Sequence, residues 1–134
     1  MKKRNFLKTS LAAATTAFFP KTIMAMGKTK DRLRTAHIGV GGMGLNDLNS
    51  IASHPKVKIV ALCDVDSNAI IKASSIYPDA KTFKDYRVML ESLANEVDAV
   101  VVSTPDHSHA PASIMAMEMN KAVYCQKPLA HHVA

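Results

Sequence analysis

Apolar residues recur along this chain in short continuous runs, separated by segments in which they fall at helical spacing. Runs of this kind, rich in Val, Ile, Leu and Ala, are typical of strands that are covered on both faces of a sheet. The predicted strands are Leu33–Val40, Val57–Cys63, Lys81–Phe83, Val97–Ser103 and Ala122–Cys125.

The segments between these strands predict four helices. In the first of them, Leu45, Leu48 and Ile51 fall on one helix face, and Pro55 ends the segment. The predicted helices span residues 45–52, 67–77, 86–93 and 109–120. Strict alternation of strand and helix predicts a doubly wound parallel sheet with right-handed crossovers, which is a Rossmann-type α/β fold. Residues 28–134 are enough for one hydrophobic core, so we expect one domain there.

Residues 1–27 have the pattern of an export signal. Residues 2–4 form a basic start, and the uncharged run Ser10–Phe19 follows. A run of that length is too short to cross a bilayer core about 30 Å thick as a helix, so we expect no stable membrane span. Residues 3–8, Lys-Arg-Asn-Phe-Leu-Lys, resemble a twin-arginine signal with lysine in place of the first arginine. The sequence therefore predicts an exported, periplasmic or extracellular protein; the alternative is a frayed amphipathic N-terminus on a cytoplasmic one.

The basic charge of the chain is concentrated in this leader. The sequence has 17 Lys and Arg against 11 Asp and Glu, a net charge of +6. Five of the cations and none of the acids lie in residues 1–27, which leaves twelve cations and eleven acids in the remainder. A nearly neutral body lacks the clustered basic face that a phosphate backbone requires. Because there is also no Trp and only 5% aromatic residues for base stacking, we expect no nucleic acid partner.

A glycine-rich turn follows the first predicted strand. Residues 39–44, Gly-Val-Gly-Gly-Met-Gly, fit the G-x-G-x-x-G pattern where a strand ends and a helix begins, which is the context that dinucleotide binding requires. In that pattern Gly39 permits a tight turn, Gly41 lets the backbone approach a pyrophosphate, and Gly44 lets helix and strand pack closely. The alternative is a plain tight turn. The candidate cofactor-binding residues of this turn are Gly39, Gly41, Gly42, Met43 and Gly44.

Dinucleotide-binding domains carry an acid about 20 residues beyond this turn, where it accepts hydrogen bonds from the adenosine ribose hydroxyls. Asp64 ends the second predicted strand, 20 residues beyond Gly44. A carboxylate there repels a 2′-phosphate, so the sequence predicts NAD in preference to NADP. Asp66 is the rival for this role, but we expect it to cap the following helix instead.

Two further polar segments follow the fourth and fifth predicted strands. Residues 103–109 read Ser-Thr-Pro-Asp-His-Ser-His, and residues 125–128 read Cys-Gln-Lys-Pro. Both lie at the carboxyl ends of strands, where ligands bind in open α/β sheets. Together with the glycine turn and Asp64, these segments resemble the glucose–fructose oxidoreductase/inositol dehydrogenase (Gfo/Idh/MocA) family. The resemblance rests on four motifs in order and runs from about residue 34 to the last residue.

This resemblance implies roles for individual residues. Thr104 and Pro105 are expected to line the nicotinamide ribose, and Asp106 stands where a cofactor-contacting Asn or Asp is usual. His109 matches the family's histidine after the Thr-Pro pair. Lys127 matches the lysine of the Glu-Lys-Pro motif, which holds the substrate hydroxyl and assists its proton transfer. A cation suits that role because the oxygen becomes alkoxide-like as hydride leaves.

Gln126 departs from the family pattern, in which Glu is commonest at this position. Glutamine cannot ionise or form an ion pair with Lys127, but it can hydrogen-bond to a cofactor or to the backbone. Gln126 therefore stays among the candidate cofactor-binding residues.

Each of these polar residues also has a simpler interpretation. Asp106 can cap a helix that His107 and His109 begin, and Lys127 can be a solvated surface residue. The histidines, including the pair at 131–132, have no carboxylate or Cys at the spacing of a tetrahedral site, so no metal is predicted.

Members of this family continue into a second α/β domain that supplies much of the sugar pocket, the remaining catalytic residue and the oligomer interface. The sequence stops at Ala134, so the resemblance implies a domain incomplete at its C-terminus with negligible turnover alone, and a homo-oligomer at full length. The leading hypothesis is the cofactor domain of an NAD-dependent oxidoreductase that acts on a sugar, polyol or related hydroxy compound. The alternatives are an NAD-dependent glycosidase of the same fold and a non-catalytic module that senses sugar or NAD.

Overall fold

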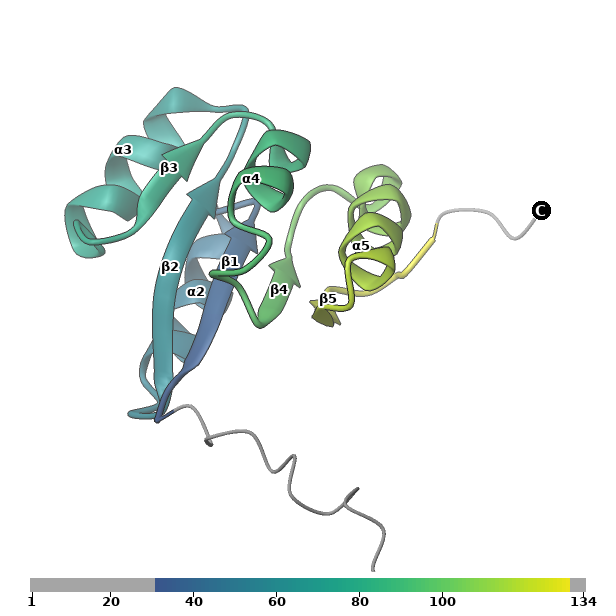
Figure 1. Ribbon diagram of the computed structural model, residues 1–134. Coiled ribbons are helices and arrows are strands. Elements are labelled where there is room, and N and C mark those ends of the chain that lie inside the picture. Colours follow the sequence, from purple (N-terminus) through teal and green to yellow (C-terminus); the bar gives the residue numbers. More distant parts are fainter. Residues whose placement is uncertain (1–30, 131–134) are drawn as a thin grey trace, which may run out of the picture. The chain divides into compact units, whose positions relative to one another are not determined.

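The computed structural model describes residues 31–130; the leader and the histidine pair at 131–132 lie outside the described residues. The strands are β1 (Leu33–Ile38), β2 (Val57–Cys63), β3 (Lys81–Phe83), β4 (Ala99–Val102) and β5 (Ala122–Cys125). The helices are α2 (Met43–Ala52), α3 (Ser67–Ile76), α4 (Tyr86–Ser92) and α5 (His109–Glu118), with a short 3-10 helix η2 (Asp106–Ser108) before α5. All strand pairs are parallel, in the order β3-β2-β1-β4-β5, which confirms the doubly wound Rossmann-type fold (Figure 1).

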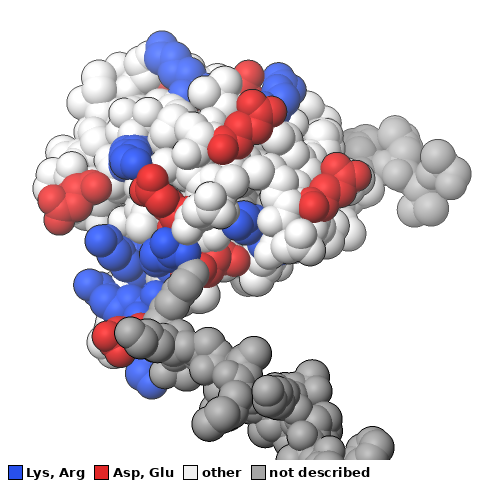
Figure 2. All heavy atoms as spheres, viewed as in Figure 1, with Lys and Arg blue, Asp and Glu red and all other residues white. Residues whose placement is uncertain are grey.

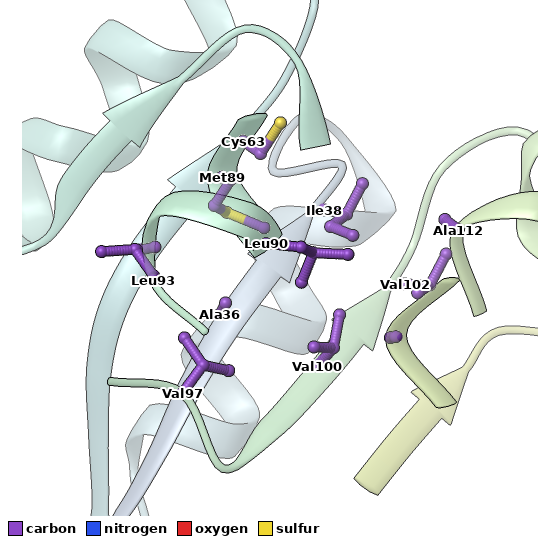
Figure 3. Close-up of a cluster of buried hydrophobic side chains, with 12 residues drawn as sticks. Ala36, Ile38, Cys63, Met89, Leu90, Leu93, Val97, Val100, Val102 and Ala112 are labelled. Carbon is purple, nitrogen blue, oxygen red and sulfur yellow. The ribbon is translucent and has the colours of Figure 1, made fainter. Parts of the chain in front are cut away.

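Helices cover both faces of the sheet. On one face, Met89 and Leu90 of α4 and Ala112 of α5 pack with strand residues in the cluster drawn in Figure 3. On the other face, Leu48 of α2 and Ala73 of α3 form a second buried cluster. In Figure 1, α4 lies in front of the sheet and α2 lies behind it. Because the strands are buried on both sides, they appear in the sequence as continuous apolar runs.

Two strands are shorter than the apolar runs that predicted them. β1 ends at Ile38 because Gly39 has a φ of 81°, outside the extended region, and the N–H of Val40 donates to Asp64 instead of to a strand. β4 begins at Ala99, two residues after Val97, although Val97 is only 3% exposed. Val97 thus contributes to the core from a loop. The apolar pattern predicted its burial correctly but predicted a strand that begins two residues too early.

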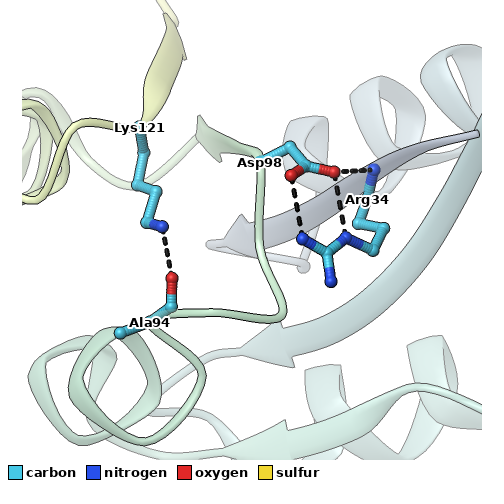
Figure 4. A network of polar contacts seen from close by, with 4 residues as sticks. All are labelled: Arg34, Ala94, Asp98 and Lys121. Atoms are coloured by element: carbon cyan, nitrogen blue, oxygen red, sulfur yellow. Dashed lines mark hydrogen bonds and ion pairs between the residues drawn. The ribbon is translucent and has the colours of Figure 1, made fainter. Parts of the chain in front are cut away.

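An ion pair joins the amino ends of two neighbouring strands: Arg34 is in β1, and Asp98 immediately precedes β4. Arg34 donates from Nε to Oδ2 of Asp98 at 3.0 Å and from Nη2 to Oδ1 at 2.9 Å, and its backbone N–H donates to Oδ2 at 3.1 Å (Figure 4). Nearby, Nζ of Lys121 donates to the carbonyl oxygen of Ala94, which links the segment before β5 to the loop after α4. These contacts fix the amino ends of the strands, opposite the glycine turn.

The surface of the described residues carries charges of both signs. Residues 31–130 contain ten Lys and Arg and eleven Asp and Glu, and Figure 2 shows the two kinds interspersed over one face. None of the helices in this part of the chain is long and apolar enough to cross a membrane.

One histidine is buried inside the sheet. His37 of β1 is 1% exposed, and its Nε2 lies 3.1 Å from Oγ1 of Thr35. Burial lowers the pKa of His37 from 6.5 to about 4, and the negative charge of Asp47 opposes this shift only in part. Between those two pH values the unfolded chain binds more protons than the folded one, so stability rises with pH there.

We predict that the stability contributed by neutral His37 is fully present above pH 6.5 and is lost as the pH falls towards 4. The shift corresponds to on the order of 3 kcal/mol over the whole window. Urea unfolding of the wild type and of His37→Gln, measured at several pH values across this window, checks the prediction. The free energy of unfolding of the variant should depend less on pH; parallel curves for the two proteins would contradict it.

Candidate functional site

A cavity of about 450 Å³ opens at the carboxyl ends of the strands, between β1 and β4. This is the switch point of the sheet: β2 and β3 lie on one side of it, and β4 and β5 lie on the other. This is the place at which doubly wound sheets bind their ligands. The wall combines the glycine turn with the segments that follow β2 and β4. The residues predicted as cofactor-binding that line it are Gly39, Gly41, Asp64, Thr104 and Pro105.

Close packing explains two of the glycines in the turn. A Cβ on Gly44 would lie 2.1 Å from the carbonyl oxygen of Gly39, so α2 approaches β1 as closely as the motif predicts. A Cβ on Gly39 would lie 2.7 Å from the carbonyl carbon and oxygen of Ser103. Any larger side chain at either position would push the start of α2 or the end of β4 away from the turn. Gly42 immediately precedes α2, and Met43 is its first residue.

Asp64 ties the glycine turn to the end of β2. Its Oδ2 accepts hydrogen bonds from the N–H groups of Val40 at 2.9 Å and Gly41 at 3.3 Å, and its Oδ1 accepts from Asp66 N–H at 2.9 Å. A carboxylate accepts about four hydrogen bonds, so capacity for about one more remains at the cavity wall. The ribose role of Asp64 stays a prediction.

Asp66 has the other role that the sequence suggested. Its side chain accepts a hydrogen bond from the N–H of Asn68 at 2.9 Å, at the start of α3. The predicted N-cap is therefore confirmed.

The segment after β4 lines the cavity with Thr104 and Pro105. Oγ1 of Thr104 is buried and has no hydrogen-bond partner among the described residues, although Thr104 lines the cavity. Asp106 begins η2, and its Oδ1 accepts from His107 N–H at 2.9 Å instead of capping α5. His107, which the sequence did not distinguish from a helix-start residue, lies on the cavity wall.

The buried ring of His109 lies between two backbone carbonyl groups, one after β4 and one after β5. The ring is 2% exposed; Nδ1 lies 2.7 Å from the carbonyl oxygen of Pro128, and Nε2 lies 2.6 Å from that of Thr104. The side chain therefore joins the segment after β4 to the segment after β5. A direct contact of His109 with a cofactor stays a prediction, while its effect on the position of Thr104 follows from these bonds.

Gln126 and Lys127 follow β5 and are not on the cavity wall. The amide nitrogen of Gln126 donates to Asp47 of α2, with distances of 3.0 Å to Oδ1 and 2.9 Å to Oδ2. Ser103 donates to the same carboxylate from Oγ at 2.7 Å. Lys127 is exposed beside this contact. Asp47 and Ser103 were not identified from the sequence, because nothing in the spacing of α2 marks Asp47 as different from other polar helix residues.

The thiol at the cavity is not a nucleophile. Burial, followed by the charges of Asp64 and Asp85, raises the pKa of Cys63 to about 12, so the group stays a neutral thiol near neutral pH. Cys63 and Cys125 are both free. Within residues 31–130, no three His, Cys, Asp or Glu side chains are grouped as metal ligands.

These features fit a dinucleotide cofactor. The turn brings backbone N–H groups to the start of a helix, where phosphates bind. Asp64 places a carboxylate on the cavity wall, and Thr104 and Pro105 line the same cavity. The fold and the site together define a dinucleotide-binding Rossmann domain.

The comparisons with known proteins agree with this class and give the family. Residues 33–134 match the model of the Gfo/Idh/MocA oxidoreductase family, NAD-binding Rossmann fold. The chain therefore belongs to this family.

Individual relatives match over most of this chain but over only part of their own length. A glycosyl hydrolase family 109 protein of Stenotrophomonas maltophilia is 32% identical over 94% of this chain and 29% of its own length. The inositol 2-dehydrogenase of Salmonella typhimurium is 30% identical over 73% of this chain and 29% of its own. The chain thus spans less than a third of the length of these relatives.

Solved structures show the same correspondence. Myo-inositol 2-dehydrogenase from Lactobacillus plantarum has a TM-score of 0.70 and 30% identity, covering 75% of this chain and 30% of that one. The WlbA dehydrogenase from Bordetella pertussis, in complex with NADH and UDP-GlcNAcA, has a TM-score of 0.69 and 26% identity, covering 75% and 30%.

We predict that Gly44→Ala disrupts the site, because its methyl group would overlap the carbonyl oxygen of Gly39. Displacing α2 should cost about 1–3 kcal/mol of stability and weaken NAD binding roughly tenfold, the equivalent of about 1.4 kcal/mol. Urea unfolding and NAD titration measure the two effects. Asn46→Ala, at an exposed position of the same helix, is the matched control and should leave both unchanged. Wild-type NAD affinity in Gly44→Ala would show that the close approach does not shape the site.

Proposed function

We propose that this chain binds NAD in the cavity at the β1–β4 switch point. In the whole protein, we propose, it serves as the cofactor domain of an oxidoreductase acting on a sugar, polyol or related hydroxy compound. The observation that carries the proposal is the convergence of the glycine turn, Asp64 and the Thr104–Pro105 segment on one cavity. The inositol 2-dehydrogenases among the relatives support this substrate class. A homo-oligomer is part of the same proposal for the whole protein.

Each residue has a distinct task in this function. The N–H groups at the start of α2 hold the pyrophosphate, Asp64 accepts from the adenosine ribose, and Thr104 and Pro105 hold the nicotinamide ribose. The bound nicotinamide supplies the hydride acceptor or donor. Lys127, at the end of β5, holds the substrate hydroxyl and stabilises the oxygen as its proton leaves.

The preference for NAD over NADP provides the first test. Asp64 disfavours a 2′-phosphate by charge, so NAD should bind at least tenfold tighter than NADP, a difference of about 1.4 kcal/mol. Asp64→Ala should weaken NAD by a similar factor, because it removes the ribose acceptor and the bonds that hold Val40 and Gly41. Calorimetric titration of both cofactors into each protein measures this.

Asp79→Ala removes a carboxylate at an exposed position away from the cavity and is the control for net charge. Equal affinities of the wild type for the two cofactors, or unchanged NAD binding by Asp64→Ala, would exclude the role given to Asp64.

An NAD-dependent glycosidase is the second candidate function. It is favoured by the Stenotrophomonas maltophilia relative, which is named a glycosyl hydrolase family 109 protein and matches 94% of this chain. The products separate the two functions: an oxidoreductase forms net NADH from a polyol, whereas the glycosidase cleaves a glycoside without net NADH. In either reaction Lys127→Met should lower kcat, because the cation beside the reacting oxygen is lost. In the whole protein, NAD binding with neither activity would favour the sensing module.

We infer that the whole protein is exported, by the twin-arginine route, to the periplasm or beyond. The support is the basic start at residues 2–4 followed by the uncharged run Ser10–Phe19. A reporter fused to residues 1–27 should leave the cytoplasm, and replacing Lys3 and Arg4 by Gln should retain it there. Cell fractionation measures the distribution; a reporter that stays cytoplasmic with the native leader would refute export.

A further inference from the structure

Asp47 lies at the meeting point of three segments that are distant in the sequence. It projects from α2, the helix that follows the glycine turn. Its carboxylate accepts from Oγ of Ser103, which follows β4, at 2.7 Å, and from the amide nitrogen of Gln126, which follows β5, at 2.9 and 3.0 Å. One side chain therefore connects the phosphate-binding helix with both segments on the β4 side of the switch point.

The charge of Asp47 is balanced by hydrogen bonds. No Lys or Arg within residues 31–130 forms an ion pair with Asp47. The charge of Asp47 acts on the pKa of buried His37, but this histidine stays neutral near neutral pH. An ionised carboxylate only accepts hydrogen bonds, so it requires donors around it. The Ser103 hydroxyl and the Gln126 amide are those donors.

This arrangement favours glutamine over glutamate at position 126, because Asp47 needs a hydrogen-bond donor there. The amide nitrogen faces Asp47, and the amide oxygen accepts from Lys127 N–H at 3.3 Å, so both ends of the side chain are used. A glutamate would bring a second carboxylate to hydrogen-bond distance of the first, and two carboxylates sharing a site do not both ionise readily. Gln126, the one departure from the family's motif, thus has a partner in Asp47.

The segments held by Asp47 belong to one half of the cofactor site. In doubly wound sheets the dinucleotide crosses the switch point, with one mononucleotide on each side. Asp64 follows β2 on the adenosine side, whereas Ser103, Gln126 and Lys127 follow β4 and β5 on the other. His109 joins the same two segments through Thr104 and Pro128, from a helix on the opposite face of the sheet from α2.

We propose that Asp47 is a positioning residue that selects glutamine at position 126 and holds the Ser103–Thr104 and Gln126–Lys127 segments against α2, so that the nicotinamide half of the site is formed. The proposal rests on the NAD-binding function. Asp47 itself does not line the cavity and acts through the two segments that it holds.

A charge-exchange cycle tests the proposal in the 134-residue chain. Four proteins are compared: the wild type, Gln126→Glu, Asp47→Asn and the double variant, in which an amide at position 47 donates to a carboxylate at 126. Asn95→Asp, an exposed amide-to-acid change after α4, controls for added charge. Each protein is titrated with NAD and with ADP, which lacks both the nicotinamide and its ribose, and its urea unfolding midpoint is measured.

Gln126→Glu should weaken NAD roughly tenfold and ADP by no more than about threefold, and the double variant should regain most of the lost NAD affinity. Equal losses for the two ligands would assign Asp47 a merely structural role, and a double variant no better than Gln126→Glu would exclude the pairing; either result overturns the proposal. If Gln126→Glu unfolds, recovery of the urea midpoint in the double variant supports the pairing and its absence refutes it. A folded wild type that binds neither ligand would refute the NAD-binding function, while the urea midpoints still decide the pairing.

Discussion

The close approach of α2 to the end of β1 is the constraint on which the site depends. The space that a Cβ on residue 44 would need is taken by the carbonyl oxygen of Gly39, 2.1 Å away. Only a glycine pair lets the helix start directly above the strand end, beside the cavity that Gly39, Gly41 and Asp64 line. The same approach brings Asp47, one turn further along α2, within reach of the strand ends beyond β1.

Polar side chains from opposite faces of the sheet then hold the other half of the site. Asp47 binds the segments after β4 and β5 from α2, and His109 binds them from α5. Partly buried polar groups of this kind are costly unless they are paired, so their hydrogen bonds specify one arrangement of the two segments. The hydroxyls of Thr104 and Ser113 are exceptions, because both are buried without a partner among residues 31–130.

The sequence predicted features accurately where one physical cause produces the pattern, and less accurately where several causes compete. Burial on both faces produces apolar runs, and these located all five strands. The ends of the strands were less accurate because other forces decide them. Gly39 ends β1 through its backbone angle, and Val97 is buried without pairing in β4. The cap formed by Asp66 was predictable because capping is a local interaction.

The sequence by itself determined the alternation of strands and helices, the glycine turn, the acid that follows β2 and hence the family. Each of these is encoded by neighbours in the chain or by a fixed spacing from a strand end. Only the tertiary structure decided that Gln126 pairs with Asp47, 79 positions away, that His109 is buried between two carbonyl groups, and that His107 faces the cavity. The physical reason is that such contacts depend on which side of a helix meets which strand end, and spacing along the chain does not carry that information.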